Sequence, residues 1–165
     1  MLYAVLAAVL ILVDQLSKYL VRAHIPLGES VPFIPHILDL TYVRNTGAAF
    51  SILQEHTWIL TLASAVIVVI VGLMVTRKVL TGRLGLLSAV LVMAGGVGNL
   101  IDRLIFKYVT DMFQTVFMDF AVFNVADCCI TVGVVLLCVY LLFFYDKDHK
   151  KEDPAHGADL PSDGQ

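Results

Sequence analysis

The sequence predicts an all-α membrane protein with four transmembrane helices, a small extracytoplasmic β-sheet element and an interfacial flap. Two observations lead to this fold class. Of the 165 residues, 59% are apolar and only 15% are charged, whereas soluble domains are about 45–50% apolar and about 25% charged. The apolar residues are also concentrated in four long stretches, each close to the roughly 20 residues that a transmembrane helix needs.

The four expected spans are residues 2–21, 58–75, 84–101 and 120–145. No Lys or Arg precedes the first span, and two charged residues lie in its second half, so we expect a retained helix rather than a cleaved signal peptide. We expect residues 1–145 to form a single domain. The polar residues 146–165 are expected to be a disordered tail.

The distribution of basic residues predicts that both chain ends are cytoplasmic. The short segment 76–83 contains three Lys or Arg residues, whereas the much longer segment 22–57 contains only two. The positive-inside rule therefore places 76–83 in the cytoplasm, and four spans then bring both termini to the same side. The net charge of -3 provides no basic patch for a nucleic acid, so we expect no nucleic-acid partner.

The two outer segments are expected to differ in structure. Residues 23–57 contain three prolines, which exclude one long helix, and residues 38–43 alternate in polarity as a strand does. A turn at Asn45-Thr46-Gly47 would let residues 48–53 return as a second strand, which gives a small sheet on the outer membrane surface. Residues 102–119 mix aromatic and charged side chains and are expected to form an interfacial flap.

Polar side chains gather at one expected depth, near the outer ends of three spans. An ionisable residue within a span costs about 2.5–3.5 kcal/mol on insertion scales, so a grouping at one level indicates a function. Structural alternatives are an ion pair between residues four apart, helix-to-helix hydrogen bonds and charged helix ends. The residues are Asp14 and Lys18 in the first span, Asn99, Asp102 and Arg103 at the end of the third, and Asn124 and Asp127 at the start of the fourth.

Asp111 is a further candidate, in the outer segment between the third and fourth spans. If this segment folds back, Asp111 can meet Asp127, and two neighbouring carboxyl groups tend to share one proton. One could then take a proton from water while the other gives one to a carbonyl oxygen, which hydrolyses a peptide bond without a metal or a covalent nucleophile. On local sequence alone, a solvated loop carboxylate is the simpler interpretation of Asp111.

Five motifs, in order along the chain, resemble those of the lipoprotein signal peptidase (signal peptidase II) family of bacterial membrane aspartic peptidases. Each motif alone would be weak, whereas five in order are highly specific. They are Asp14-Gln15-Leu16-Ser17-Lys18, Asn45-Thr46-Gly47-Ala48-Ala49-Phe50, Gly95-Gly96-Val97-Gly98-Asn99-Leu100-Ile101-Asp102-Arg103, Val109-Thr110-Asp111 and Phe123-Asn124-Val125-Ala126-Asp127.

The resemblance implies that Asp111 and Asp127 are the catalytic pair. The Val-Thr-Asp context favours Asp111 over Asp119, the other acid nearby. The residues that the resemblance places in site support or substrate binding are Asn99, Arg103, Asn124, Asp14, Lys18 and Asn45. Further supporting candidates are Gly47, Gly95, Gly98, Asp102 and Ala126, of which the helix glycines would let another helix approach closely.

The resemblance also implies the reaction. The family's substrate is a prolipoprotein that carries diacylglycerol on its lipobox cysteine, and the cut falls just before that cysteine. Family members need no metal or organic cofactor and are blocked by the cyclic peptide globomycin. We therefore expect a monomeric, multi-pass aspartic endopeptidase of the bacterial cytoplasmic membrane, surrounded by lipids, with its site near the extracytoplasmic face.

Two other functions compete with this interpretation. A small proton-coupled transporter also uses buried carboxylates, but it would need polar residues across the full membrane depth. A non-enzymatic subunit of a membrane assembly would use the same polar residues to join helices. Cleavage of a lipidated precursor by the purified protein separates the peptidase from both.

Overall fold

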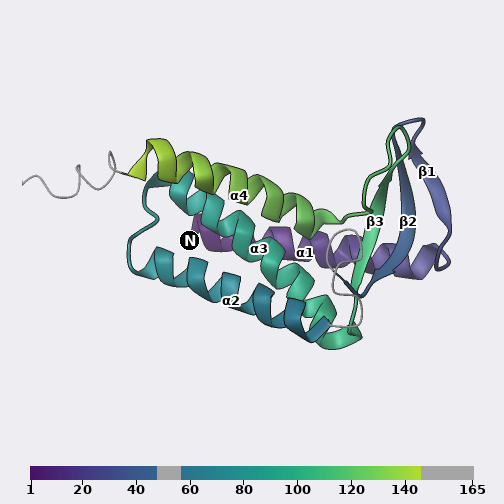
Figure 1. The fold of residues 1–165 in the computed structure, drawn as a ribbon, viewed down its shortest axis with the longest axis horizontal. Helices are drawn as coiled ribbons and strands as arrows, with labels where there is room; N and C mark the ends of the chain where they lie inside the picture. Colours follow the sequence, from purple (N-terminus) through teal and green to yellow (C-terminus); the bar gives the residue numbers. More distant parts are fainter. Residues whose placement is uncertain (48–56, 146–165) are drawn as a thin grey trace, which may run out of the picture.

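The computed structural model describes residues 1–47 and 57–145 (Figure 1). The strand expected at 48–53 and the tail expected at 146–165 lie outside these residues. In the described ranges the elements are α1 (Leu2–His24), β1 (Ser30–Ile34), β2 (Leu38–Asn45), α2 (Thr57–Thr76), α3 (Gly82–Phe106), β3 (Val109–Thr115) and α4 (Val125–Phe143). The helices run side by side along the molecule, and the sheet lies at one end of the bundle.

The helices confirm the four expected spans. In the described part of the chain, four helices are long and apolar enough to cross a membrane. Even α4, with 19 residues, is about 28 Å long at 1.5 Å per residue, close to the roughly 30 Å of a bilayer's hydrocarbon core. Large apolar side chains are exposed along the helices, as a lipid environment requires.

Helix α3 is the central helix of the bundle. Half of its apolar window is buried, against 17% for α1, 6% for α2 and 22% for α4, because α3 packs against all three. Glycines in α3 allow the neighbouring helices to approach it closely. A Cβ atom on Gly95 would overlap the carbonyl oxygen of Ala126 in α4, and one on Gly98 would lie 2.6 Å from an Asp14 carboxylate oxygen in α1.

The sheet is antiparallel, with the strand order β1-β2-β3. It therefore includes the expected strand at 38–43, and residues 109–115 of the expected flap form its third strand. In the β2–β3 register, Val43 lies opposite Asp111. Val21 of α1 and Ile25, the residue after α1, pack against Tyr42 and Met112 of the sheet, which fixes the sheet beside the end of α1.

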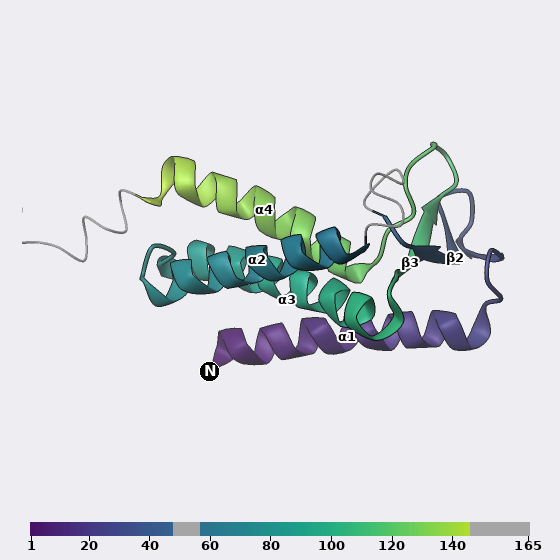
Figure 2. The same cartoon turned by 60° about the horizontal axis from the view of Figure 1, so that its bottom comes forward.

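The two ends of the bundle differ. The N-terminus, the α2–α3 connection and the end of α4 lie at one end, and the sheet lies at the other (Figures 1 and 2). Helix α4 starts five residues later than the expected span because Asn124 caps it. The Asn124 side chain accepts from the Asp127 backbone N–H, and the Asp127 side chain accepts from the Asn124 backbone N–H.

Candidate active site

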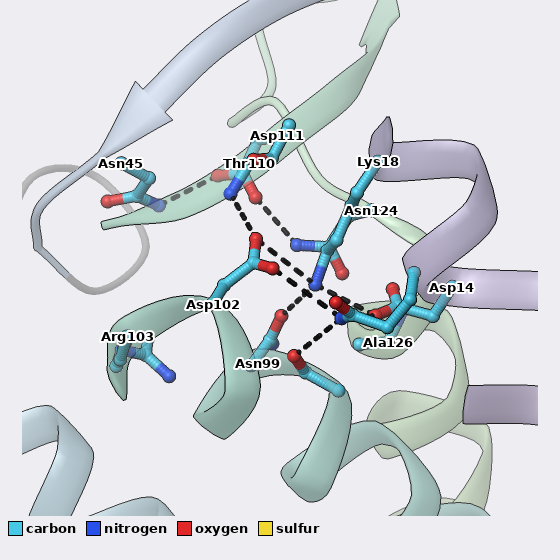
Figure 3. A network of polar contacts seen from close by, with 12 residues as sticks. Asp14, Lys18, Asn45, Asn99, Asp102, Arg103, Thr110, Asp111, Asn124 and Ala126 are labelled. Atoms are coloured by element: carbon cyan, nitrogen blue, oxygen red, sulfur yellow. Dashed lines mark hydrogen bonds and ion pairs between the residues drawn. The ribbon is translucent and has the colours of Figure 1, made fainter. Parts of the chain in front are cut away.

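Except for Arg103, which donates to Ser64 in α2, the polar side chains expected at one depth form a connected network at the sheet end of the bundle (Figure 3). Lys18 lies at its centre with a fully buried side chain. Its Nζ donates to Asn99 Oδ1 at 2.9 Å, and it lies 2.9 Å from an Asp14 oxygen and 3.7 Å from an Asp102 oxygen. The pairing of Asp14 with Lys18 along α1, expected from their spacing, is therefore present.

Asp14 and Asp102 connect elements rather than face the cavity. The Ala126 N–H at the start of α4 donates to Asp14 Oδ1 at 2.9 Å. The Thr110 N–H in β3 donates to Asp102 Oδ2 at 2.8 Å. These two buried carboxylates thereby tie α4 to α1 and β3 to α3, and so fix the two segments that carry Asp111 and Asp127.

A cavity of about 540 Å³ lies beside the network. Asp111 from β3 and Asp127 from α4 both line it, so the fold brings the two acids expected to form a pair into one space. Asp119, the other acid of this outer segment, is exposed and is not among the described lining residues. These are Asn45, Gly47, Asn99, Arg103, Val109, Asp111, Phe120, Ala121, Val122, Phe123, Asp127, Cys128, Ile130, Thr131 and Val132.

Asp111 is almost completely buried, with 2% of its surface exposed. Asn124 Nδ2 donates to its Oδ1 at 2.7 Å, and Asn45 Nδ2 donates to its Oδ2 at 2.8 Å. Burial raises the pKa of Asp111, and so does the charge of Asp127, while the two amide hydrogen bonds lower it, with a result of about 7. Asp111 can therefore gain or lose a proton near neutral pH.

Asp127 lies in the first turn of α4. Asn99 Nδ2 donates to its Oδ1 at 2.8 Å, and the Asn124 backbone N–H donates to its Oδ2 at 3.1 Å. Asn124 thus binds both acids, Asp111 through its side chain and Asp127 through its backbone. This shared partner couples the positions of the two carboxyl groups.

Arg103 also lines the cavity. Its Nη1 donates to Ser64 Oγ in α2 at 3.2 Å. Its Nε is buried and has no hydrogen-bond partner among the described residues. The guanidinium therefore keeps an unused donor beside the cavity.

Sequence reasoning missed several members of the network. Gln15 Nε2 donates to the Gly98 carbonyl oxygen and to Asp14 Oδ2, both at 3.0 Å, and Arg22 Nη1 donates to Thr110 Oγ1 at 2.8 Å. Gln15 could have been found as a polar amide inside an apolar span. Residues 120–123 line the cavity, but their apolar side chains gave no signal of it.

Comparisons with known proteins identify the family. The family model described as signal peptidase (SPase) II matches residues 6–143. The lipoprotein signal peptidase of Streptococcus pyogenes serotype M2 (strain MGAS10270) is 45% identical over 143 residues, which cover 85% of this chain and 92% of the relative. The lipoprotein signal peptidase of Streptococcus pyogenes serotype M5 (strain Manfredo) is 44% identical over 143 residues, which again cover 85% of this chain and 92% of the relative.

Solved structures show the same fold. A bacterial membrane enzyme determined by the in meso method at 2.3 Å resolution matches with a TM-score of 0.80 and 28% identity, over 96% of this chain and 92% of that one. A second bacterial membrane enzyme, determined by the in meso method at 1.9 Å resolution, matches with a TM-score of 0.78 and 30% identity. The match covers 86% of this chain and 93% of that one. With the family model matching most of its length, the chain belongs to the signal peptidase II family.

Proposed function

We propose that this protein is an aspartic endopeptidase that removes the signal peptide from diacylglyceryl-modified prolipoproteins by cutting just before the lipidated cysteine. Family membership supports the general activity. One observation carries the catalytic part of the proposal: Asp111 and Asp127, from two separate elements, line the same cavity. Catalysis by two carboxyl groups requires this arrangement.

In the proposed mechanism the pair holds one proton. The pKa of about 7 for Asp111 keeps a proton available near neutral pH. The ionised acid accepts a proton from water as the water attacks the scissile carbonyl carbon, and the protonated acid donates to the carbonyl oxygen. The proton taken from water then passes to the leaving nitrogen as the C–N bond breaks, and one hydroxyl of the tetrahedral intermediate returns its proton to the other acid, so that the pair again holds one proton. The asparagine amides hold both carboxyl groups in place throughout.

The composition of the cavity suits a lipid-modified peptide. Its lining combines the two acids and Arg103 with apolar residues such as Phe120, Phe123 and Val132. A peptide must be unwound to be cut, and its freed backbone groups then need hydrogen-bond partners inside the membrane. The unused Arg103 donor could bind a substrate carbonyl or a lipid phosphate.

We further propose that the site faces the extracytoplasmic side of the bacterial cytoplasmic membrane. The α2–α3 connection, at the opposite end of the bundle from the sheet, contains Arg77 and Lys78, with Arg83 just inside α3. The positive-inside rule places this end in the cytoplasm together with both termini. The substrate arrives through the surrounding lipid, and the chain acts as a single-domain monomer.

Substitution of the acids tests the catalytic pair. We expect Asp111→Asn and Asp127→Asn each to abolish cleavage of a lipidated precursor by the purified protein, because either change removes a group that must exchange a proton. Both variants should insert into membranes and accumulate as the parent does. Cleavage retained by either variant would remove that residue from the mechanism.

A second experiment tests the substrate. The purified protein should cut a precursor that carries diacylglycerol and should cut the unlipidated form more slowly. Equal cleavage of both would contradict the proposed specificity. Failure to cut either would favour a transporter or an assembly subunit, although the polar network lies beside the strands of the sheet (Figure 3), and the sheet lies at one end of the bundle (Figure 1).

A further inference from the structure

The sheet has one packed end and one free end. At the packed end, Tyr42 and Met112 are buried against α1. The edge strand β1, which leads to the free end, is exposed along its whole length. Two stretches that reach the free end, residues 31–38 and 113–118, contain no Asp, Glu, Lys or Arg. A strand end that faced only water would be expected to carry charged side chains.

Six large apolar side chains form the surface of this free end, which we call the apolar tip. The hairpin between β1 and β2 and the segment after β3 lie together here, because the Val116 N–H donates to the Ile37 carbonyl oxygen at 3.0 Å. The exposed fractions range from 42% to 67% in the six residues, which are Phe33, Ile34, Ile37, Val116, Phe117 and Met118. Contiguous exposed apolar side chains mark an interaction surface.

The depth of the sheet indicates what covers the tip. The sheet packs on Val21 and Ile25, at the end of α1. Helix α1 has 23 residues and is about 35 Å long, so its last turn reaches the layer of lipid headgroups that borders a hydrocarbon core of about 30 Å. The strands cross the long axis of the bundle, and the tip projects sideways past α4 (Figure 1), over the area that lipid occupies.

We propose that the apolar tip is immersed in the interfacial layer of the bilayer, with phospholipid as its partner. Glu29, Asp39 and Asp119 lie next to or within two residues of the two uncharged stretches in the sequence, where they can stay in water. The two stretches carry no Lys or Arg, and His36 is the one side chain in them that can become cationic. Burial of apolar surface therefore drives the contact more than attraction to anionic lipids does. The immersed tip holds β2 and β3, which carry Asn45 and Asp111, against the membrane. This inference does not depend on the proposed peptidase activity.

Fluorescence quenching tests the proposal in the full chain. Trp58 is the one tryptophan, so Trp58→Phe provides a silent background. Phe117→Trp then places a reporter on the tip, and Glu29→Trp provides an exposed control outside it. Both proteins are reconstituted in phosphatidylcholine vesicles at low density, with bromine atoms near the glycerol end of the acyl chains.

We expect the Phe117→Trp indole to emit at shorter wavelength than the Glu29→Trp indole and to be quenched by the brominated lipid. Emission and quenching equal to those of the control would overturn the proposal. A short emission wavelength without bromine quenching would also overturn it, because a second copy of the chain would then cover the tip.

The second test places a charge on the tip and measures bromine quenching of a tryptophan reporter at Phe33→Trp. Phe117→Asp should drive the tip out of the lipid and abolish the bromine quenching at Phe33→Trp. Ser30→Asp introduces a matched charge on β1, the strand that carries the Phe33→Trp reporter, but outside the apolar tip. This change should leave the quenching unchanged. Quenching that persists in Phe117→Asp would show that these apolar side chains do not hold the tip in the bilayer.

Discussion

The carboxyl group of Asp111 is held by two amides whose own orientation is fixed. Asn45 Oδ1 accepts from the Gly47 N–H at 2.9 Å, and Asn124 Oδ1 accepts from the Asp127 N–H at 3.0 Å. Each amide therefore presents its NH₂ group to Asp111. These donors stabilise a charged Asp111, while burial and the neighbouring Asp127 favour its protonated form. The balance leaves Asp111 able to titrate near neutral pH.

The first residue-scale prediction concerns pH. In the proposed mechanism the pair holds one proton, so activity should fall as pH rises through the pKa of about 7 of Asp111. The Asn45 hydrogen bond lowers that pKa, so Asn45→Ala should raise it and move the alkaline limb of kcat/KM to higher pH. Thr46→Ala, at the exposed neighbouring residue, should leave the limb in place. A shift of the limb to lower pH in Asn45→Ala would contradict this assignment.

The second residue-scale prediction concerns Lys18. Lys18→Met removes the cation beside the buried Asp14 and Asp102, and an uncompensated buried charge typically costs about 3–5 kcal/mol. Thermal unfolding in detergent should show a large loss of stability. Adding Asp14→Asn should recover part of it, because one of the unpaired charges is then gone. A single variant as stable as the parent would show that Lys18 does not hold this network together.

At the scale of elements, hydropathy predicted the four helices because lipid-facing and packed positions are both apolar in a span. The strand β3 was not predicted as a strand. Its first four residues are all buried, so the alternation that identifies a half-exposed strand is missing. Its partner β2 is also distant in sequence, and the register that sets Val43 opposite Asp111 follows from tertiary packing.

The candidate site was predictable where helical spacing fixes neighbours. Asp14 and Lys18 are four residues apart on α1, and Asn124 and Asp127 have the spacing of a helix cap. The contacts between elements were not predictable from spacing. The bond from Asn45 to Asp111 and that from Arg22 to Thr110 depend on how the sheet packs on the bundle. The pairing of Asp111 with Asp127 rested on the family motifs.

The close approach of α3 to α4 gives the element-scale prediction. Gly95→Ala should destabilise the fold and widen the cavity, because the new Cβ would overlap the Ala126 carbonyl oxygen and lie 2.8 Å from Ile130 Cγ1. Gly72→Ala is the matched control, since its Cβ would meet only Met93 Cε at 3.6 Å among the described residues. That change should gain up to about 1 kcal/mol in helix propensity. Thermal unfolding of the two variants tests the difference, and equal stability would contradict close packing at Gly95.

At the scale of the whole molecule, the two ends of the bundle have different chemistry. The buried charges and amides lie at the sheet end (Figure 3). The opposite end contains the α2–α3 connection, where the Thr81 N–H donates to Tyr140 Oη at 3.1 Å and ties the turn to α4. A site confined to one end can act only on a bond at one membrane surface. The orientation of the chain therefore decides from which side a substrate is cut.

Cysteine labelling of oriented membrane vesicles measures this orientation. In a chain with Cys128, Cys129 and Cys138 replaced by alanine, Glu29→Cys reports on the sheet end and Arg77→Cys on the opposite end, both at exposed positions. A membrane-impermeant maleimide should label Glu29→Cys in right-side-out vesicles and Arg77→Cys in inside-out vesicles, because the positive-inside rule keeps the basic turn in the cytoplasm. The reverse pattern would place the acids at the cytoplasmic surface. In that orientation the proposed Asp pair could not cut a precursor whose lipidated cysteine lies at the outer surface.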